Sequence, residues 1–313
     1  MIQSRWLLVF APWLAWGSVS ETMRWEWESG YRNDRLHWHL SGDGDPTYSE
    51  HDRDLRFWEN DLTLRVIYRD IALFARGSFA ALGHGDMRQT WAHLSYTSDS
   101  PSHSWHSDAW GLDGWGYFGY AVNLTADRTY QVILIPIVGY GAETEHLEPS
   151  GSKTGTGTAV APAESYSMTC QLPGKERMTW FGPLFGGLFI IRPGGSLRFE
   201  AGYAYHRLHL RFTSKRQTEV SLFGAGSALL SETTTQDKIK VKDGANLAHT
   251  GWARADYEIS NAWRSGLEVQ IKYFCSRILN ASIKNETAHT SSSQKFKARW
   301  MSVSGAISIS RTF

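Results

Sequence analysis

The sequence predicts an all-β protein, a transmembrane antiparallel up-and-down β-barrel of about ten strands, with twelve strands as the alternative. Three observations lead to this fold class. Apolar and polar residues alternate with a period of two, and short and long connections alternate along the chain. After the first 20 residues, no apolar run approaches the ~20 residues that a spanning helix needs. The 313 residues suit one such barrel.

The composition excludes several classes of protein. Hydrophobic residues make up 42% of the chain, which is too many for a disordered protein. The 32 Lys and Arg residues against 31 Asp and Glu leave a formal net charge of +1. A neutral chain lacks the positive charge that binding to phosphate backbones requires, so we expect no nucleic-acid partner. The 2 cysteines, Cys170 and Cys275, are too few for a disulfide scaffold.

Residues 1–20 have the pattern of a secretory signal peptide. Arg5 supplies a positive charge, Trp6 to Trp16 form an apolar stretch, and Gly17 to Ser20 are small or short side chains apart from one valine. The apolar stretch is too short to span a bilayer as a helix, so we expect cleavage after Ser20 and export. A buried first helix is the alternative. The predicted domains are a signal peptide over 1–20 and an outer-membrane β-barrel over 21–313.

The last segment shows the alternation most clearly. Odd positions from Met301 to Phe313 are mostly apolar, whereas even positions from Ser302 to Thr312 are small and largely polar. A soluble sheet would bury the apolar face, but an outer-membrane barrel turns that face towards lipid and the polar face towards the lumen. The aromatic end resembles bacterial barrels whose last strand is read by the insertion machinery. This resemblance implies that Phe313 belongs to a C-terminal insertion signal.

The same alternation recurs along the chain and predicts ten strands. The expected strands are 24–40, 54–69, 71–83, 109–124, 130–147, 177–193, 197–213, 246–260, 264–282 and 296–313. The long connections are 41–53, 84–108, 148–176, 214–245 and 283–295, and the others are short. Outer-membrane barrels have an even number of strands, short periplasmic turns and long outer loops. Closure also leaves no unpaired backbone edge in lipid.

The order of these pieces resembles the omptins, ten-stranded outer-membrane proteases, over most of residues 21–313. The resemblance rests on Trp27 to Leu40 with Ser29-Gly30, the strand from Leu55, Ile71 to Gly83 followed by Gly85-Asp86-Met87, Tyr130 to Glu143, Gly182-Pro183-Leu184, and Gly305 to Phe313. The sequence looks still more like the outer-membrane proteins of environmental chlamydiae, the Protochlamydia outer membrane proteins. That second resemblance implies an envelope barrel, which is pore-forming in some members.

Omptin chemistry needs an Asp-x-Asp pair after the third strand and an Asp-x-His pair after the seventh. Arg88 and Thr90 stand at the first pair, and Asp86 is a lone carboxylate nearby. Neither His206 nor His209 has an Asp two positions before it. A general base without an orienting carboxylate is poorly suited to activating water. We therefore expect no catalytic residues and a protein that is not an enzyme.

Four histidines, His37, His39, His206 and His209, lie where the outer rim of the barrel is expected. Imidazole is a common metal ligand, so these residues raise the possibility of a metal site. Alternate histidines at strand ends are equally typical of residues that face a lumen or a polar interface. We favour this second interpretation and expect neither a metal nor a cofactor.

The predicted lumen carries the most informative chemistry. The lumen-lining candidates are Glu59, Asp61, Arg65, Arg76, Arg198, Glu200, Arg254, Asp256, Glu258, Glu268 and Lys272. In one interpretation these charges pair and plug the barrel, because ~8 strands leave a filled interior whereas ~16 leave an open channel. In the other, the small residues of the last strand, with Gly202 and Ala204, leave a narrow wet path.

The function we favour is that of a bacterial outer-membrane barrel without catalysis, either a narrow porin-like channel or a structural component of the cell envelope. An omptin-like endopeptidase with a rebuilt site is one alternative. An adhesin that presents segments 148–176 and 214–245 is another. The expected partners are outer-membrane lipid and the barrel-insertion machinery. The sequence leaves the oligomeric state, any selectivity and the state of the two cysteines open.

Overall fold

The computed structural model describes residues 22–41, 48–93, 96–99, 103–105, 108–125, 130–148, 152–158, 165–171, 174–223, 229–242 and 246–313. The expected signal peptide over residues 1–20 lies outside these ranges. All regular secondary structure in the described ranges is β-strand. No helix in this part of the chain is long and apolar enough to cross a membrane.

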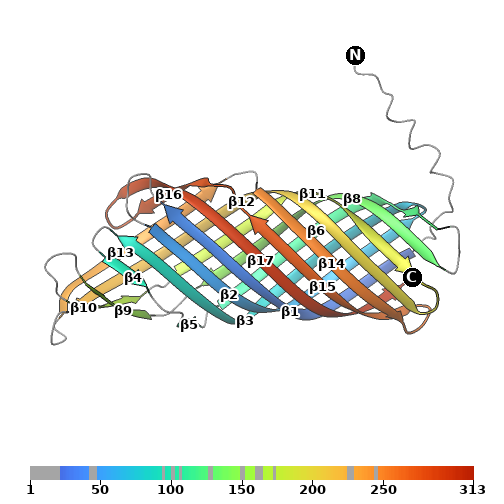
Figure 1. Cartoon of the computed structure of the whole chain (residues 1–313), viewed down its shortest axis with the longest axis horizontal. Coiled ribbons are helices and arrows are strands. Elements are labelled where there is room, and N and C mark those ends of the chain that lie inside the picture. The colour runs from blue at the N-terminus through green and yellow to red at the C-terminus, as the bar shows by residue number, and fades with distance from the viewer. Residues whose placement is uncertain are drawn as a thin grey trace, which may run out of the picture.

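Ten long antiparallel strands close into a ring (Figure 1). They are β1 (Thr22–Ser41), β2 (Tyr48–Tyr68), β3 (Ile71–His93), β6 (Asp108–Tyr120), β8 (Gln131–Glu148), β11 (Gly174–Arg192), β12 (Leu197–Phe223), β14 (Asn246–Glu258), β15 (Trp263–Cys275) and β17 (Thr290–Thr312). Each pairs with the next, and β17 pairs back onto β1 from Arg24 opposite Thr312 to Ser41 opposite Lys295. The prediction of an antiparallel ten-stranded barrel is confirmed, and the ring does not have the alternative twelve strands.

Shorter strands extend the hairpins where loops were expected. They are β4 (Tyr96–Asp99), β5 (His103–Trp105), β9 (Ser152–Thr158), β10 (Ser165–Gln171), β13 (Leu229–Lys242) and β16 (Leu279–Asn285), and β7 (Val122–Asn123) pairs with β8 near a short turn. The span expected at 264–282 is in fact interrupted after Cys275, and β16 begins at Leu279. The sequence pattern did not predict these extensions, because a segment of polar residues can form backbone hydrogen bonds with a neighbouring strand without having an apolar face.

Tight turns join neighbouring ring strands at one end, where the C-terminus also lies (Figure 1). Arg69 in the β2–β3 turn has a φ of 55°. In the β11–β12 turn, Gly194 and Gly195 have φ values of 93° and 69°. Glycine has no Cβ and adopts positive φ without steric cost, which explains the two glycines there. We call this end of the barrel the short-turn end.

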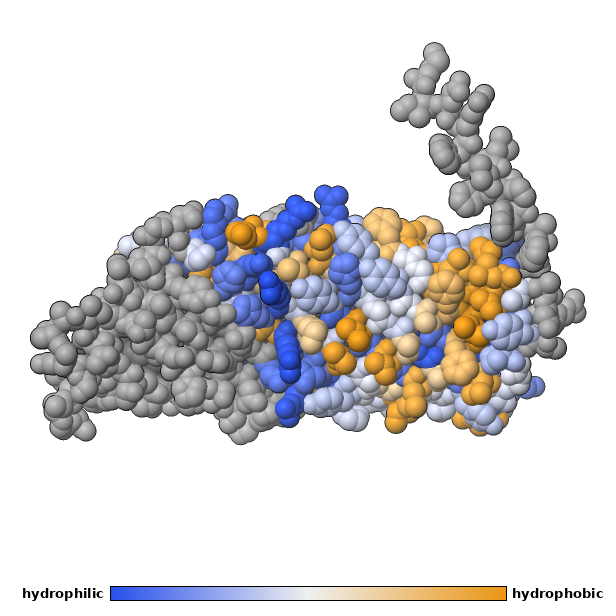
Figure 2. All heavy atoms as spheres, in the orientation of Figure 1, coloured by the Kyte–Doolittle hydropathy of each residue, from blue (hydrophilic) through white to orange (hydrophobic). Residues whose placement is uncertain are grey.

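An apolar belt surrounds the outside of the ring towards the short-turn end (Figure 2). Its exposed side chains include Trp27, Tyr31, Leu62, Leu73, Phe79, Phe118, Tyr140, Phe185, Phe189, Tyr203, Leu267, Ile271 and Ile307. Leu267 is 62% exposed and Ile307 is 66% exposed. Such residues on the outer face of a closed barrel form a surface suited to lipid.

Beyond this belt the two faces of the wall exchange character. On β1, Leu36 and Trp38 point inward and are buried, whereas Arg35 between the belt and the far end is exposed. On β17, Trp300 is buried and its neighbour Arg299 is exposed. The expectation that polar residues face the lumen along whole strands is therefore wrong here. Polar outside and apolar inside is the pattern of a sheet in water, whose interior excludes water.

The inward apolar residues of this far half form one buried group, which we call the outer apolar cluster. Its large members are Leu36, Trp38, Leu40, Leu55, Phe57, Met178, Trp180, Leu208, Leu210, Phe212, Phe274, Phe296 and Trp300. Several rings are in contact, and Phe274 stacks on Trp300 with ring centroids 4.9 Å apart. Side chains thus fill the barrel in this half.

Glycines in the wall make room for lumenal aromatic rings. A Cβ on Gly202 would meet the ring of Trp252, and a Cβ on Gly141 would meet the ring of Trp115. Both tryptophans are partly buried and pack against apolar residues inside the ring. Gly202 was expected to help leave a wet path, but Trp252 takes up the space above it.

Candidate functional site: the charged lumen

Charged side chains occupy the middle of the ring, and two groups can be distinguished by their contacts. The inner network lies nearer the short-turn end and comprises Arg24, Glu26, Glu28, Asp61, Arg65, Arg76, Arg198, Glu200, Arg254, Asp256 and Glu268. The outer cluster lies towards the outer apolar cluster and comprises Arg32, Asp34, Glu59, Asp113, Glu143, Glu145 and Lys272. All are buried except Arg76, whose side chain is 16% exposed.

Arg254 on β14 is the centre of the inner network. Its Nη1 contacts Glu26 and lies 2.5 Å from Glu28 Oε1, and its Nε lies 2.5 Å from Asp256 Oδ1. Glu268 Oε2 is 3.6 Å from the same Nη1. Within the described residues, Glu26, Glu28 and Glu268 are the one group with ligand atoms close enough together for a metal ion. The guanidinium of Arg254 contacts all three carboxylates, so it already supplies the positive charge there.

Two further arginines share one carboxylate. Glu200 Oε2 lies 2.5 Å from Arg65 Nη1 and 3.1 Å from Arg198 Nη2. Arg76 on β3 lies on the other side of the network, with Nη1 2.6 Å from Glu268 Oε1 and Nη2 2.8 Å from Asp61 Oδ2. Ion pairs inside a barrel need such multiple partners, because a buried charge with no partner is costly.

The outer cluster has two cations and five carboxyl groups. Arg32 Nη2 lies 2.8 Å from Asp34 Oδ2 and 2.8 Å from Glu145 Oε1. Arg32 Nη1 lies 3.2 Å from Glu59 Oε1, and the guanidinium stands over the Phe57 ring at 4.8 Å. Lys272 Nζ lies 2.5 Å from Asp113 Oδ2 and 3.4 Å from Glu143 Oε2. The cluster therefore joins strands from opposite parts of the ring.

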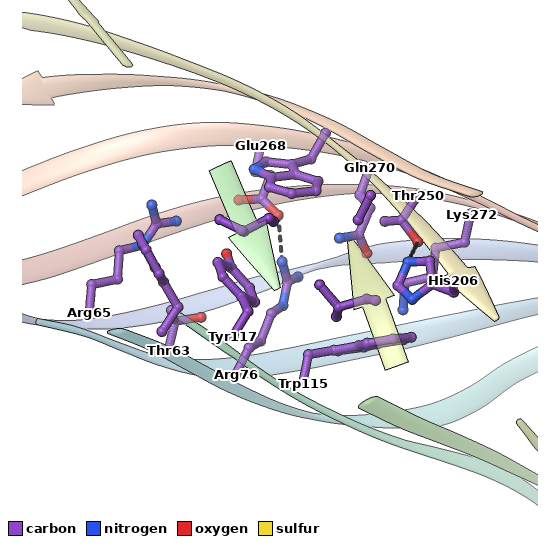
Figure 3. A pocket seen from close by; sticks show the side chains of 15 residues that line it. Thr63, Arg65, Arg76, Trp115, Tyr117, His206, Thr250, Glu268, Gln270 and Lys272 are labelled. Atoms are coloured by element: carbon purple, nitrogen blue, oxygen red, sulfur yellow. Dashed lines mark hydrogen bonds and ion pairs between the residues drawn. The ribbon is translucent and has the colours of Figure 1, made fainter. Parts of the chain in front are cut away.

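Between the inner network and Lys272 lies a cavity of about 50 Å³ (Figure 3). Glu268, Gln270 and Lys272 of β15 lie on one side, and Arg76, Trp115 and Tyr117 rise from the opposite side (Figure 3). The lining also includes the apolar residues Phe74, Ile137 and Leu184. A single water needs roughly 10–15 Å³ of such volume, so the cavity holds a few waters. It is far smaller than a solute channel.

The four histidines considered as metal ligands do not form one group, although the ring centroids of His37 and His39 lie 6.1 Å apart. His206 is buried inside the ring, where Nε2 lies 3.0 Å from Thr250 Oγ1 and the ring meets Trp115 edge-on (Figure 3). His209 is exposed on the other face of β12 and stacks on Phe181. Three residues apart on a strand places the two histidines on opposite faces. His37 and His39 alternate with the inward residues of β1, so they lie on the outer face.

Ten of the eleven lumen-lining candidates lie in the two charged groups, and the structure brings them together. The exception is Glu258, which is partly exposed at the short-turn end and pairs with Arg264 at 3.7 Å. Phe313 is exposed, and its backbone N–H donates to the carbonyl of Met23 at 2.9 Å. Cys275 is a free thiol on the outer face of β15. Cys170 in β10, and Asp86, Arg88 and Thr90 in β3, have side chains outside the described part.

Sequence reasoning missed eight members of the charged groups. They are Arg24, Glu26, Glu28, Arg32 and Asp34 on β1, Asp113 on β6, and Glu143 and Glu145 on β8. A signal was present on β1, where Arg24, Glu26 and Glu28 alternate with hydrophobic or aromatic neighbours. On β6, Gly114 and Gly116 interrupt the outward apolar face, and on β8, Gly139 and Gly141 interrupt the inward polar face, so the alternation is hidden on both strands.

A closed antiparallel ring with an apolar outer belt and a polar lumen defines the class of protein, an outer-membrane β-barrel. The chain belongs to the Protochlamydia outer membrane protein family, whose model matches residues 26–313. Both the resemblance to this family and the location in the outer membrane are thereby confirmed, and lipid surrounds the barrel. No curated protein matches the sequence.

One solved structure has the same architecture at low sequence identity, and two others match with low TM-scores. The outer membrane protease OmpT from Escherichia coli matches with a TM-score of 0.64 and 10% identity, covering 96% of this chain and 99% of that chain. The translocator domain of the autotransporter NalP from Neisseria meningitidis has a TM-score of 0.31 and 12% identity, covering 99% and 94%. The P. putida toluene transporter TodX has a TM-score of 0.26 and 8% identity, covering 92% and 90%. The first likeness establishes an omptin-like fold and nothing about activity.

Proposed function

We propose that this protein is a closed structural barrel of the outer membrane, with a plugged lumen and no catalytic activity. The observation that carries this proposal is the sequence of layers inside the ring. The inner network, the outer cluster and the outer apolar cluster follow one another along the barrel axis, and all of their side chains except that of Arg76 are buried. A ten-stranded ring is close to the size at which side chains fill the interior.

Ion conductance tests the closed state. Refolded protein inserted into a planar bilayer should give no stepwise current at potentials at which a known porin in the same membrane conducts. The narrow channel is the second candidate, supported by the cavity beside Arg76 and Gln270. Reproducible single-channel openings would favour that channel and contradict the plug.

The absence of catalysis is a separate part of the proposal. Arg88 and Thr90 stand where an omptin has its paired carboxylates, and no carboxylate precedes His206 or His209 by two positions. The contacts of His206 with Thr250 and Trp115 are those of a packed lumenal side chain rather than of an oriented base. These residues therefore provide no positioned general base that could deprotonate a water molecule.

Peptide cleavage tests this second part. Refolded protein incubated with dibasic peptides in the presence of lipopolysaccharide should leave the peptides intact. Specific cleavage that disappears in Asp86→Ala or His209→Ala would overturn the non-catalytic assignment. Cleavage that persists in both variants would point to a contaminating protease, which a mock preparation from cells without the protein identifies.

We also propose that the C-terminal strand presents the insertion signal. The odd residues of β17 from Met301 to Ile309 face outward in the apolar belt, and Phe313 ends this face. An exposed apolar row that ends in an aromatic residue offers a binding edge before the β1–β17 seam closes. The partner in this proposal is the machinery that inserts barrels into the outer membrane.

A further inference from the structure

The two charged groups in the lumen differ in their charge balance. The inner network has six carboxyl groups and five arginines, which is close to neutral. The outer cluster has five carboxyl groups, Asp34, Glu59, Asp113, Glu143 and Glu145, but only Arg32 and Lys272 as cations within the described residues. Three buried negative charges in excess would be very costly in a site that excludes water. The cluster must therefore take up positive charge.

The excess is concentrated at one pair of carboxyl groups. Glu59 receives hydrogen bonds from Arg32 and from Ser78, and Asp113 and Glu143 both contact Lys272. Asp34 and Glu145 share one nitrogen, Arg32 Nη2, which is 2.8 Å from an oxygen of each. Arg32 carries a single positive charge, so it cannot balance two ionised carboxylates that share one of its nitrogens. Two ionised carboxylates this close together repel each other, and neither has a proton to donate to the other.

Both carboxyl groups of this pair are buried, so an oxygen atom there that lacks a hydrogen-bond donor is costly. Asp34 is 0% exposed and Glu145 is 1% exposed. Asp34 Oδ1 and Glu145 Oε2 are buried and have no hydrogen-bond partner among the described residues. An oxygen left without a donor in a dry site loses its hydration energy with nothing in return. These two oxygens are where an additional proton can reside.

We propose that Asp34 and Glu145 form a proton-binding site that holds one shared proton at neutral pH. The proton bridges the two carboxyl groups as an O–H···O⁻ hydrogen bond, and Arg32 balances the remaining negative charge. Arg32 from β1, Glu59 from β2, Asp113 from β6, Glu143 from β8 and Lys272 from β15 are the other charged groups that face this site. A metal ion fits this site less well than a proton. Within the described residues, no three of these five carboxyl groups have ligand atoms close enough together to hold a metal ion.

This site has a consequence for stability that is independent of whether the barrel conducts. An ordinary carboxyl group, with a pKa near ~4, is ionised at neutral pH in the unfolded chain. The folded state would then bind one more proton than the unfolded state, and stability must fall as pH rises. The inference goes beyond the proposed function, since a pore and a plug would titrate alike.

Infrared spectroscopy of the refolded protein tests the site directly. A protonated carboxylic acid has a C=O band separate from the carboxylate bands. We expect the wild type to show this band at neutral pH, and Glu145→Gln to lose one carboxylic-acid component of it. Asp34→Asn serves as a second variant with the same expectation. The exposed Glu286→Gln is the control and should leave the band unchanged.

Thermal unfolding against pH provides the second readout. The melting temperature of the wild type should fall between neutral and alkaline pH, and the fall should be smaller in Glu145→Gln and Asp34→Asn, whose amides donate without a titratable proton. Glu286→Gln should follow the wild type. An unchanged carboxylic-acid band in both folded variants, or an alkaline fall equal to that of the wild type, would overturn the proposal.

Discussion

Arg254 on β14 reaches Glu28 on β1, with two strands of the ring between them, and its Nη1 lies 2.5 Å from the carboxylate. The same guanidinium contacts Glu26, Asp256 and Glu268. One side chain therefore ties three strands together inside the lumen. Backbone hydrogen bonds between neighbouring strands close the ring. Ion pairs such as these fix the side chains inside it.

Arg254→Ala should be the most damaging single change in the inner network. It leaves several buried carboxylates without their shared cation, and breaking a buried pair costs ~3–5 kcal/mol. The free energy of unfolding, from urea titration followed by heat-modifiable gel mobility, measures the loss. Arg264→Ala is the matched control, since its partly exposed pair with Glu258 is worth ~0–1 kcal/mol. Equal effects of the two variants would contradict a dry network.

Arg198→Ala should destabilise the barrel less than Arg65→Ala. Both arginines pair with Glu200, but Arg65 also contacts Glu26, whereas among the described residues Glu200 is the one ion-pair partner of Arg198. Glu200 keeps Arg65 when Arg198 is removed. The comparison uses the same unfolding titration, together with the conductance of each variant. Near-neutral stability of Arg198→Ala with a new cation-selective current would mean that this arginine is solvated in a channel.

Trp38→Ala should expose the role of the outer apolar cluster. Trp38 is fully buried beside Phe212 and Phe296, and truncating a buried aromatic residue costs ~3–5 kcal/mol. Trp58 is 57% exposed on the outer face of β2, so Trp58→Ala should cost clearly less. Urea unfolding in the same detergent compares them. A larger loss at Trp58 would mean that the far half of the barrel has no packed core.

Ile271→Arg tests the position of the apolar belt. Ile271 is 52% exposed on β15, and a charge on the lipid face costs ~2–4 kcal/mol near the bilayer midplane. Arg277→Ile, just beyond the end of β15, is the converse change outside the belt and should have little effect. Unfolding from lipid vesicles measures both. A tolerated arginine at position 271 would place this strand outside the membrane or shift its register by one residue.

Phe313→Ala should reduce assembly rather than the stability of assembled protein. Phe313 is 65% exposed, so its loss removes little packing. The fraction of chain found folded in the outer membrane, by heat-modifiable mobility, should fall, while the urea midpoint of the folded fraction stays close to the wild type. Tyr257→Ala, another exposed aromatic near the short-turn end, is the control. Normal assembly of Phe313→Ala would remove this residue from the insertion signal.

Period-two alternation along the chain, together with the alternation of short and long connections, was enough to predict the strand number. The pattern is clearest in β17, whose even positions are small or polar and whose odd positions face lipid. It also identified Arg254 and Glu268 as inward residues. It did not predict the reversal beyond Arg35 and Arg299, since an apolar-in and an apolar-out strand have the same period. Which face of a strand contacts water depends on where that strand extends beyond the apolar belt. The position of the belt is set by all ten strands together.

The pairing inside the lumen was beyond the sequence for another reason. Arg32 and Glu145 are 113 positions apart, and Arg254 and Glu26 are 228 apart. Only closure of the ring brings such residues into contact. The number of acids and bases was visible in the chain, but the division into a balanced inner network and an acidic outer cluster requires the registers of β1, β8 and β15.

The central claim is a closed, dry lumen, and the reactivity of an inward cysteine tests it most directly. Ser302 is 2% exposed and lies opposite Asp34 and Lys272 in the registers of its two neighbours. In a background with Cys170→Ser and Cys275→Ser, the account predicts that Ser302→Cys reacts with a small charged thiol reagent only after unfolding. Arg299→Cys on the exposed face should react at once. Rapid labelling of Ser302→Cys in the folded barrel, at a rate similar to Arg299→Cys, would contradict the plugged lumen.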